Sequence, residues 1–250
     1  MLKSINIDNV IKSYKKKISI SGDKSLSIRW ALLASQAIGK SRAYGLLKSE
    51  DIISTLNCLK KLGVKIKLKN EYCEIEGNGL NSFNYKKSLT INAGNSGTLG
   101  RLILALLIKS PKKIKLIGDK SLSKRDFSRI INPLKKFGAS FYPKNKTSLP
   151  IYIKGSEFIR PIKYNENKGS AQVKSSIMLA TLNAPGKTII KAKKSRDHTE
   201  IFFKNLKIPI KIIKKKKIDI IEIQGNKRFN SFNYKIPSDI SSSAFFIVLT

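Results

Sequence analysis

A pattern of elements that recurs after about 70 residues most strongly constrains the fold of this chain. The segment Leu59-Lys-Lys-Leu-Gly-Val64 returns as Leu134-Lys-Lys-Phe-Gly-Ala139, with a weaker copy at Asn205-Leu-Lys-Ile208. In the first two copies, apolar positions at helical spacing end at a glycine, which is typical of a helix C-terminus. The period is longer than that of common solenoid repeats. We therefore expect a larger unit, strand–helix–strand–helix–strand–strand (βαβαββ), to be present three times.

Three such units would bury their apolar helices against one another, with the sheets outside. The expected helices end at residues 39, 62, 107, 137, 182 and 206. The expected strands lie at 42–46, 64–68, 72–76, around 89, at 113–117 and at 188–191. Residues 1–20 are expected to form two further short strands joined by a turn. This order of elements predicts an α/β fold.

Turns of small residues precede the first helix of each unit. Residues 92–101 read Asn-Ala-Gly-Asn-Ser-Gly-Thr-Leu-Gly-Arg, and similar turns occur at Lys24/Ser25 and Ser170/Gln172. Glycines let the backbone approach a ligand closely, and the free N–H groups of a helix start attract anions. Each turn alone is also consistent with an ordinary N-cap. Three of them on one side of a domain predict a site for a ligand that carries phosphate and carboxylate groups.

Several arginines lie near these helix starts. Arg29, Arg125 and Arg196 can form two-pronged contacts with oxyanions, and Arg101 adds a positive charge one turn into its helix. The alternative is that they are surface arginines. His198 is the only histidine and lies between Asp and Thr at a helix start, which favours a capping or orienting role over that of a base. The sequence contains no recognisable Ser/His/Asp order and no metal-ligand spacing.

The formal net charge of +34 raises the question of nucleic-acid binding. Almost all of the excess is lysine spread along the chain, so we expect no specific nucleic-acid partner and only weak affinity at low salt. Cys58 and Cys73 have no metal-ligand spacing and are expected to be buried, reduced thiols. Residues 1–14 lack the apolar stretch of a secretion signal, and polar residues, above all lysines, interrupt every apolar run. These features predict a cytoplasmic protein with no membrane partner.

A series of short motifs follows a defined order along the chain. They are Ser21-Gly-Asp-Lys-Ser-Leu-Ser-Ile-Arg29, Asn92-Ala-Gly-Asn-Ser-Gly-Thr98, Lys124-Arg125, Ser170-Ala-Gln172, Ser195-Arg-Asp-His-Thr-Glu200 and Pro237-Ser-Asp-Ile-Ser-Ser242. In this order and spacing they resemble the EPSP synthase (3-phosphoshikimate 1-carboxyvinyltransferase) family. The resemblance runs from about residue 20 to the end of the chain.

The resemblance implies an enolpyruvyl transferase-like, inside-out α/β barrel of two similar domains, each with three βαβαββ units. Residues 21–236 would form one complete domain, on the shikimate 3-phosphate-binding side. Residues 1–20 and 237–250 would belong to an incomplete partner domain. The implied enzyme is a transferase of alkyl or aryl groups in the shikimate pathway. It moves the carboxyvinyl group of phosphoenolpyruvate to the 5-hydroxyl of shikimate 3-phosphate and releases phosphate, without a cofactor or metal.

The resemblance also implies roles for residues of this chain. Lys24 would touch both substrates and stabilise charge, with proton transfer as an open alternative role. Shikimate 3-phosphate would be held by Ser25, Arg29, Ser170, Ala171 and Gln172, with Ser195 and Arg196 at its phosphate. Phosphoenolpyruvate would be bound by Gly97 and Arg125. Asn95 and Thr98 complete the expected substrate-binding set.

The chain departs from the family pattern at a few positions and at its end. Ile28, Ser21, Gly100 and Ser238 stand where relatives have other residues, without removing an expected ligand contact. Asp239 is expected to cap a helix over 242–249, so the family's acidic general base would lie beyond Thr250. We therefore expect an N-terminal fragment that binds shikimate 3-phosphate weakly and turns over negligibly. The full-length protein would be a monomer.

Two alternatives stay open on the sequence alone. One is a basic protein that binds RNA or another polyanion on the same fold, which lysines clustered with stacking aromatics would support. The other is an enolpyruvyl transferase with a different acceptor, which the motifs at 24–29 and 195–200 disfavour.

Overall fold

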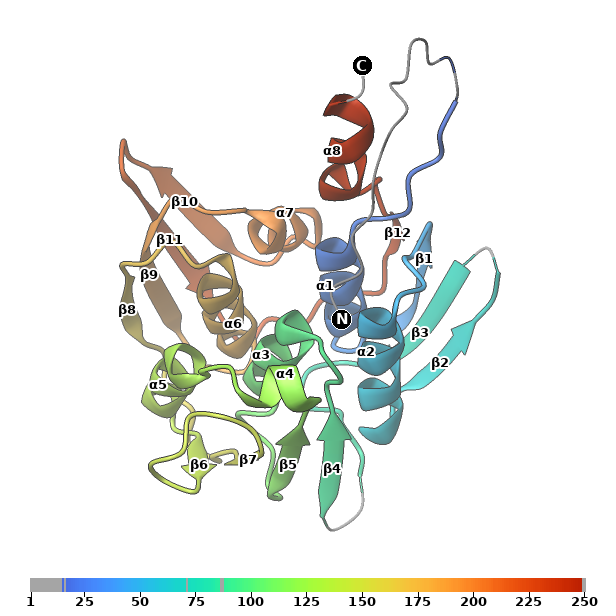
Figure 1. The fold of residues 1–250 in the computed structure, drawn as a ribbon. Coiled ribbons are helices and arrows are strands. Elements are labelled where there is room, and N and C mark those ends of the chain that lie inside the picture. The colour runs from blue at the N-terminus through green and yellow to red at the C-terminus, as the bar shows by residue number, and fades with distance from the viewer. Residues whose placement is uncertain (1–14, 16, 71, 86–87, 249–250) are drawn as a thin grey trace, which may run out of the picture.

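The computed structural model describes residues 15, 17–70, 72–85 and 88–248, and in these ranges three separate sheets surround a group of helices. Figure 1 shows the sheets on the outside, with the helices α1, α3 and α6 between them. Each sheet has four strands, in the orders β12-β1-β3-β2, β4-β5-β7-β6 and β10-β11-β9-β8. The expected arrangement of helices inside and sheets outside is confirmed.

The second and third units follow the predicted order of elements. The second comprises β4 (Leu89–Asn92), α3 (Gly97–Leu106), β5 (Ile114–Ile117), α4 (Lys120–Ser123), α5 (Ser128–Phe137), β6 (Ser140–Tyr142) and β7 (Ile151–Lys154). The third comprises β8 (Lys163–Glu166), α6 (Ala171–Thr181), β9 (Lys187–Lys193), α7 (His198–Asn205), β10 (Ile210–Lys214) and β11 (Ile218–Gln224). In both, the first two strands are parallel and the last two are antiparallel. The short helix α4 was not among the helices expected from the sequence, and Asp119 caps it by accepting from Leu122 N at 2.6 Å.

The first unit is completed by a strand from the far end of the chain. Its contiguous part comprises α1 (Lys24–Ala34), β1 (Ile38–Tyr44), α2 (Glu50–Lys61), β2 (Lys65–Leu68) and β3 (Tyr72–Asn78). Its first strand is β12 (Asn233–Lys235), which pairs parallel to β1 with Arg42 opposite Asn233. The strands expected at 1–20 fall mostly on residues outside the described ranges, and residues 17–20 form no strand.

The centre of the molecule is built from helices that are buried on all sides. Every residue of α1 from Leu26 to Ala34 is buried, as is every residue of α6 from Val173 to Thr181. Helix α3 lies against both of them. Burying one such apolar side chain contributes roughly 1.5–3 kcal/mol, which explains why these three helices and not the amphipathic α2 occupy the centre.

One glycine in each unit lets a hairpin strand pass the end of a central helix. These glycines follow the similar segments Glu74-Ile-Glu, Tyr152-Ile-Lys and Glu222-Ile-Gln. A Cβ atom would lie 2.4 Å from the Ala34 and Ala37 oxygens at Gly77, 2.3 Å from Ser110 N at Gly155, and 2.1 Å from the Thr181 oxygen at Gly225. Each neighbour is backbone and cannot move aside. The threefold repeat therefore extends to the backbone contacts between helix and sheet.

Helix α8 (Ile240–Val248) stands apart from the three sheets (Figure 1). Asp239 caps it, as expected, because its Oδ1 accepts from Ser241 N at 2.8 Å. The helix begins earlier than predicted from the sequence, and its side chains are mostly exposed, including Phe245 at 78%. Just before it, Ser238 forms a bridge with Gly22, so the two ends of the described domain cross side by side.

No described helix is long and apolar enough to cross a membrane. Cys58 and Cys73 are free and buried, as the sequence predicts.

Candidate functional site

Capping side chains hold the starts of the three central helices. Asp23 accepts from Leu26 N at 2.7 Å, and Ser96 and Ser170 make the same type of contact in α3 and α6. The interpretation of these turns as N-caps is therefore correct. A cap satisfies only part of the free N–H groups in the first turn, so capping and anion binding are compatible at one helix start.

Gln172 joins the first turns of α3 and α6. Its Oε1 accepts from Arg101 Nη1 at 2.8 Å, and its Nε2 donates to Thr98 Oγ1 at 3.0 Å. These bonds place two expected ligand groups, Thr98 and Gln172, next to each other. The connection through Arg101 was not expected from the sequence.

Arg29 joins α1, α6 and α7 from inside the protein. It is 3% exposed, and it donates from Nε to Thr199 Oγ1 at 2.9 Å and from Nη2 to Ser175 Oγ at 2.9 Å. Its Nη1 donates to the backbone oxygen of Ser25 at 3.1 Å. Burial lowers the pKa of Arg29 to about 10, which still leaves the guanidinium charged at neutral pH. The structure thus shows a buried positive charge whose hydrogen bonds go to hydroxyl and carbonyl oxygens.

His198 is the first residue of α7 and faces the same group of side chains. Its Nδ1 lies 3.4 Å from Ser25 Oγ. Burial lowers the pKa of His198, and the positive charge of Arg29 lowers it further. The ring is therefore neutral at pH 7, which agrees with the orienting role predicted from the sequence.

Two guanidinium groups flank the start of α3. A Cβ atom on Gly97 would lie 3.0 Å from Nη1 of both Arg101 and Arg125. Burial lowers the pKa of Arg101, and the charges of Arg129 and Arg125 lower it further. This mutual repulsion of cations would be relieved by a bound anion.

Two expected ligand residues are paired with carboxylates at the surface. Lys24 Nζ lies 3.3 Å from Asp51 Oδ2, and the lysine side chain is half exposed. Asn95 donates from Nδ2 to Asp119 Oδ2 at 2.5 Å. Exposed ion pairs contribute only about 0–1 kcal/mol, so an anionic ligand can replace Asp51 as the partner of Lys24 at little cost.

The remaining expected residues lie around the starts of α6 and α7. Ala171 is the first residue of α6, and Arg196 is exposed. Ser195 Oγ is buried and finds no hydrogen-bond partner among the described residues. Ser195 also lines a pocket of about 220 Å³ together with Glu200 and Asp219.

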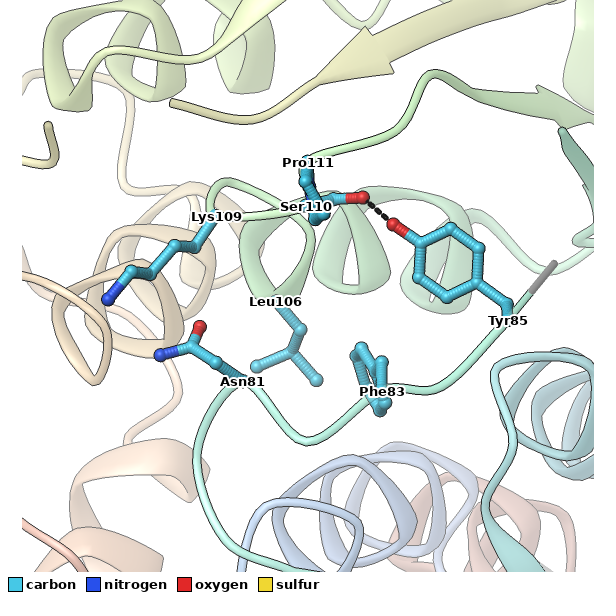
Figure 2. A pocket seen from close by; sticks show the side chains of 7 residues that line it. All are labelled: Asn81, Phe83, Tyr85, Leu106, Lys109, Ser110 and Pro111. Atoms are coloured by element: carbon cyan, nitrogen blue, oxygen red, sulfur yellow. Dashed lines mark hydrogen bonds between the residues drawn. The ribbon is translucent and has the colours of Figure 1, made fainter. Parts of the chain in front are cut away.

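A different cavity lies at the opposite end of α3 (Figure 2). Leu106, Lys109 and Ser110 line it, and the Tyr85 hydroxyl is hydrogen-bonded to Ser110. Its volume of about 30 Å³ matches a single water molecule, so we exclude it as a substrate site. Within the described ranges, no group of three or more His, Cys, Asp or Glu residues is arranged to hold a metal ion.

Comparison with known proteins identifies the family. The EPSP synthase (3-phosphoshikimate 1-carboxyvinyltransferase) family matches residues 9–250. The chain belongs to this family. A 3-phosphoshikimate 1-carboxyvinyltransferase from Vesicomyosocius okutanii is 43% identical over 244 residues, which are 97% of this chain and 54% of the relative. The one from Caldicellulosiruptor saccharolyticus is 39% identical, over 95% of this chain and 55% of the relative.

Solved structures show the same relationship. An EPSP synthase structure from Acinetobacter baumannii superposes with a TM-score of 0.84 at 35% identity, covering 93% of this chain and 52% of that one. The chain therefore spans about half the length of the EPSP synthases that it matches. The expected enolpyruvyl transferase-like fold is confirmed.

Several residues that join these helices were not predicted as site residues. These are Lys174, Ser175, Thr199 and Glu200. Arg101 was expected as a positive charge near the start of α3, but its bond to Gln172 was not. Lys174 carried a signal, because a lysine interrupts the otherwise uncharged helical run 171–182. A lysine in such a helix is expected either to be exposed or, if it is buried, to pair with a carboxylate.

Proposed function

We propose that this chain supplies the shikimate 3-phosphate-binding part of an enzyme that transfers the carboxyvinyl group of phosphoenolpyruvate to the 5-hydroxyl of shikimate 3-phosphate. The observation that carries the proposal is the joining of three helix starts by Arg29 and Gln172, with Lys24, Arg101 and Arg125 around them. Helix starts and guanidinium groups together favour phosphate and carboxylate groups.

The proposed roles follow the resemblance of the sequence motifs to the EPSP synthase family. Ser25, Arg29, Ser170, Ala171 and Gln172 bind shikimate 3-phosphate, with Ser195 and Arg196 at its phosphate. Gly97 and Arg125 bind phosphoenolpyruvate, beside Asn95 and Thr98. Lys24 contacts both substrates.

In this arrangement, Lys24 and Arg125 offset the repulsion between two anionic substrates. They also stabilise the charge that develops as the acceptor hydroxyl adds to the enol carbon. The acidic general base belongs to the half of the relatives' length that this chain does not span. The proposed chemistry needs no cofactor or metal.

The proposal includes the domain limits. Residues 21–236 form the binding domain, while 1–20 and 237–250 belong to a partner domain. Two features support these limits: β12 closes the first sheet within this range, and Gly22 and Ser238 pair where the two ends cross. A monomeric state and a cytoplasmic location are part of the same proposal.

Polyanion binding is not favoured as the function. On the sheet of the second unit, Lys113 Nζ lies 4.5 Å from the ring centre of Tyr142 and 5.0 Å from that of Tyr152. This is the pairing of lysines with aromatic rings that a polyanion-binding surface would show. The family match over residues 9–250 and the relatives named 3-phosphoshikimate 1-carboxyvinyltransferase nevertheless favour the transferase.

The test is a calorimetric titration of the 250-residue chain with shikimate 3-phosphate at near-physiological salt. Saturable binding is expected in the unaltered chain and loss of binding in Arg29→Ala. Because Arg29 is buried, Lys24→Ala serves as a second variant whose side chain is half exposed. Lys67→Ala, an exposed lysine on β2, is the matched control and should bind like the unaltered chain.

The same titration separates the alternatives. Equal binding of a UDP-sugar acceptor would contradict the acceptor assignment, and tighter binding of single-stranded RNA at the same salt would favour the polyanion alternative. Absence of shikimate 3-phosphate binding by a folded chain would contradict the proposal that this chain holds that site. With phosphoenolpyruvate added, we expect negligible turnover.

A further inference from the structure

A buried ion pair lies directly beside the Arg29 contacts. Lys174 Nζ on α6 is 2.5 Å from Glu200 Oε1 on α7, and the two side chains are 1% and 5% exposed. Lys174 precedes Ser175, and Glu200 follows Thr199. Two adjacent residues of α6 therefore contact two adjacent residues of α7, since Thr199 Oγ1 also donates to Ser175 Oγ at 2.7 Å.

Arg29 lacks a carboxylate partner although it is buried. Among the described residues, no Asp or Glu oxygen lies within 4.0 Å of its guanidinium nitrogens, and its hydrogen bonds go to Ser25, Ser175 and Thr199. A buried cation normally requires a paired anion. The guanidinium charge is therefore available to a ligand.

Two carboxylates raise the pKa of Arg29, Glu200 more than Asp23, and Asp23 already caps α1 by accepting from Leu26 N. Among the charged neighbours that act on Arg29, Glu200 has the largest effect and raises the pKa of the guanidinium. Its second oxygen, Oε2, is buried and has no hydrogen-bond partner among the described residues. The Oε2 atom of Glu200 is thus free to accept a hydrogen bond, for example from the guanidinium of Arg29. Its Oε1 atom is held by Lys174.

We propose that Lys174 is a positioning residue for the anion site: it engages the Glu200 carboxylate that would otherwise pair with Arg29, and so leaves the guanidinium charge for a phosphate-bearing ligand. This inference deepens the proposed function and rests on it. It differs from a simple tie between α6 and α7, because removing Lys174 and removing the charge of Glu200 should act on the anion site in opposite directions.

The experiment compares Lys174→Met, Glu200→Gln and the double variant Lys174→Met/Glu200→Met. Lys187→Met breaks the exposed Lys187–Glu222 pair, whose nitrogen and oxygen are 3.2 Å apart, and is the matched control. Two quantities are measured: the affinity for shikimate 3-phosphate by calorimetry, and the pKa of His198 from its imidazole proton resonances. His198 is the only histidine. Burial, Arg29 and Arg196 lower its pKa while Asp23 and Asp197 raise it, so with these four residues unchanged its resonances report a change in the local charge without any ligand.

In Lys174→Met, the affinity should fall by about tenfold or more, because Glu200 then compensates Arg29. The pKa of His198 should rise in the same variant. In Glu200→Gln, the affinity should equal or exceed that of the unaltered chain and the pKa of His198 should fall. The double variant should return both quantities close to their original values, since a buried ion pair can be replaced by apolar residues of similar volume.

The inference is overturned if folded Lys174→Met retains the original affinity and His198 pKa, or if the folded double variant stays as impaired as the single one. Equal losses in Lys174→Met and Glu200→Gln would also overturn it, in favour of a purely structural tie. If Lys174→Met fails to fold, the other two variants still test the inference. Glu200→Gln should keep or raise the affinity, and the double variant should keep the original affinity. If the unaltered chain binds no shikimate 3-phosphate, the proposed function fails, while the His198 titration still tests the role of Lys174.

Discussion

The Gln172 side-chain oxygen accepts a hydrogen bond from Arg101 Nη1 at 2.8 Å, although the two residues are 71 positions apart. This separation is close to the period of the internal repeat. The repeat therefore places equivalent first turns of α3 and α6 side by side, and one side chain links them. A single Gln orients both an arginine and, through Thr98, a hydroxyl group.

Replacing Gln172 by Ala should weaken shikimate 3-phosphate binding with little loss of stability. The change removes one proposed ligand contact and releases Arg101 and Thr98 from their fixed positions. Hydrogen bonds to charged groups contribute about 1.5–3 kcal/mol, so we expect a loss in affinity of roughly 10- to 100-fold by calorimetry. Gln224→Ala, at the end of β11, is the control for the same change elsewhere. Unaltered affinity in a folded Gln172→Ala chain would remove Gln172 from the site.

Replacing Gly225 by Ala should destabilise the domain strongly. The new methyl group would lie 2.1 Å from the Thr181 oxygen and 2.2 Å from the Ala184 oxygen, both backbone atoms. Overpacking costs typically 1–3 kcal/mol, and we expect a loss in the free energy of unfolding of about 3 kcal/mol in urea titrations.

Gly100→Ala is the matched control, because its Cβ would meet the Phe127 ring at 3.4 Å and the residue lies inside a helix. It should leave stability unchanged or raise it by up to about 1 kcal/mol. Equal effects of the two substitutions would contradict the close approach at Gly225.

Both thiols should be inert in the folded chain. Burial raises the pKa of Cys58 to about 11 and that of Cys73 to about 12, from an ordinary value of 9.0. At pH 8 the thiolate fraction of Cys58 is therefore about 100-fold below that of a free thiol.

A colorimetric thiol reagent should accordingly react at least about 100-fold faster in urea than in native buffer. Cys58→Ala and Cys73→Ala each leave one thiol and show which of them reacts. The raised pKa values also imply stability that is present below pH 9 and lost as the pH rises towards 11–12. Rapid labelling of Cys58 or Cys73 in the native chain at pH 8 would contradict the prediction that both thiols are inert.

The pKa of His198 should rise when the site is filled. In the ligand-free chain, burial and the charge of Arg29 hold it below 6.5, with Arg196 acting in the same direction. A bound phosphate offsets these positive charges and favours the imidazolium, so we expect an upward shift of about half a unit or more in an NMR titration. Arg196→Gln should raise the pKa without ligand. A downward shift on adding shikimate 3-phosphate would place the phosphate elsewhere.

The repeat and most helices could be predicted from the sequence because local signals mark them. Glycines such as Gly63 and Gly138 end helices in left-handed conformations, with φ of 87° and 119°. The strand β12 was not predicted, because it is only three residues long and its partner β1 lies far away in the chain. A signal did exist: the segment Asn-Ser-Phe-Asn-Tyr-Lys occurs at both 81–86 and 230–235, before β4 and at β12.

The helix starts of the candidate site could be predicted from turns and motifs, and the structure joins them. The roles of Arg101, Lys174 and Glu200 depend on contacts between helices, and no local pattern specifies which hydroxyl or carboxylate a buried cation meets. Sequence reasoning expected Arg29 to face a ligand, whereas the structure also shows it holding Ser25, Ser175 and Thr199 together.

The pairing of β12 with β1 has a consequence during synthesis. The edge of β1 that β12 covers remains open until residues 233–235 have left the ribosome. At about 5–20 residues per second, the nascent chain waits roughly 10–40 s between the emergence of Arg42 and that of Asn233. For that interval an unpaired strand edge is available to chaperones, or to the wrong partner.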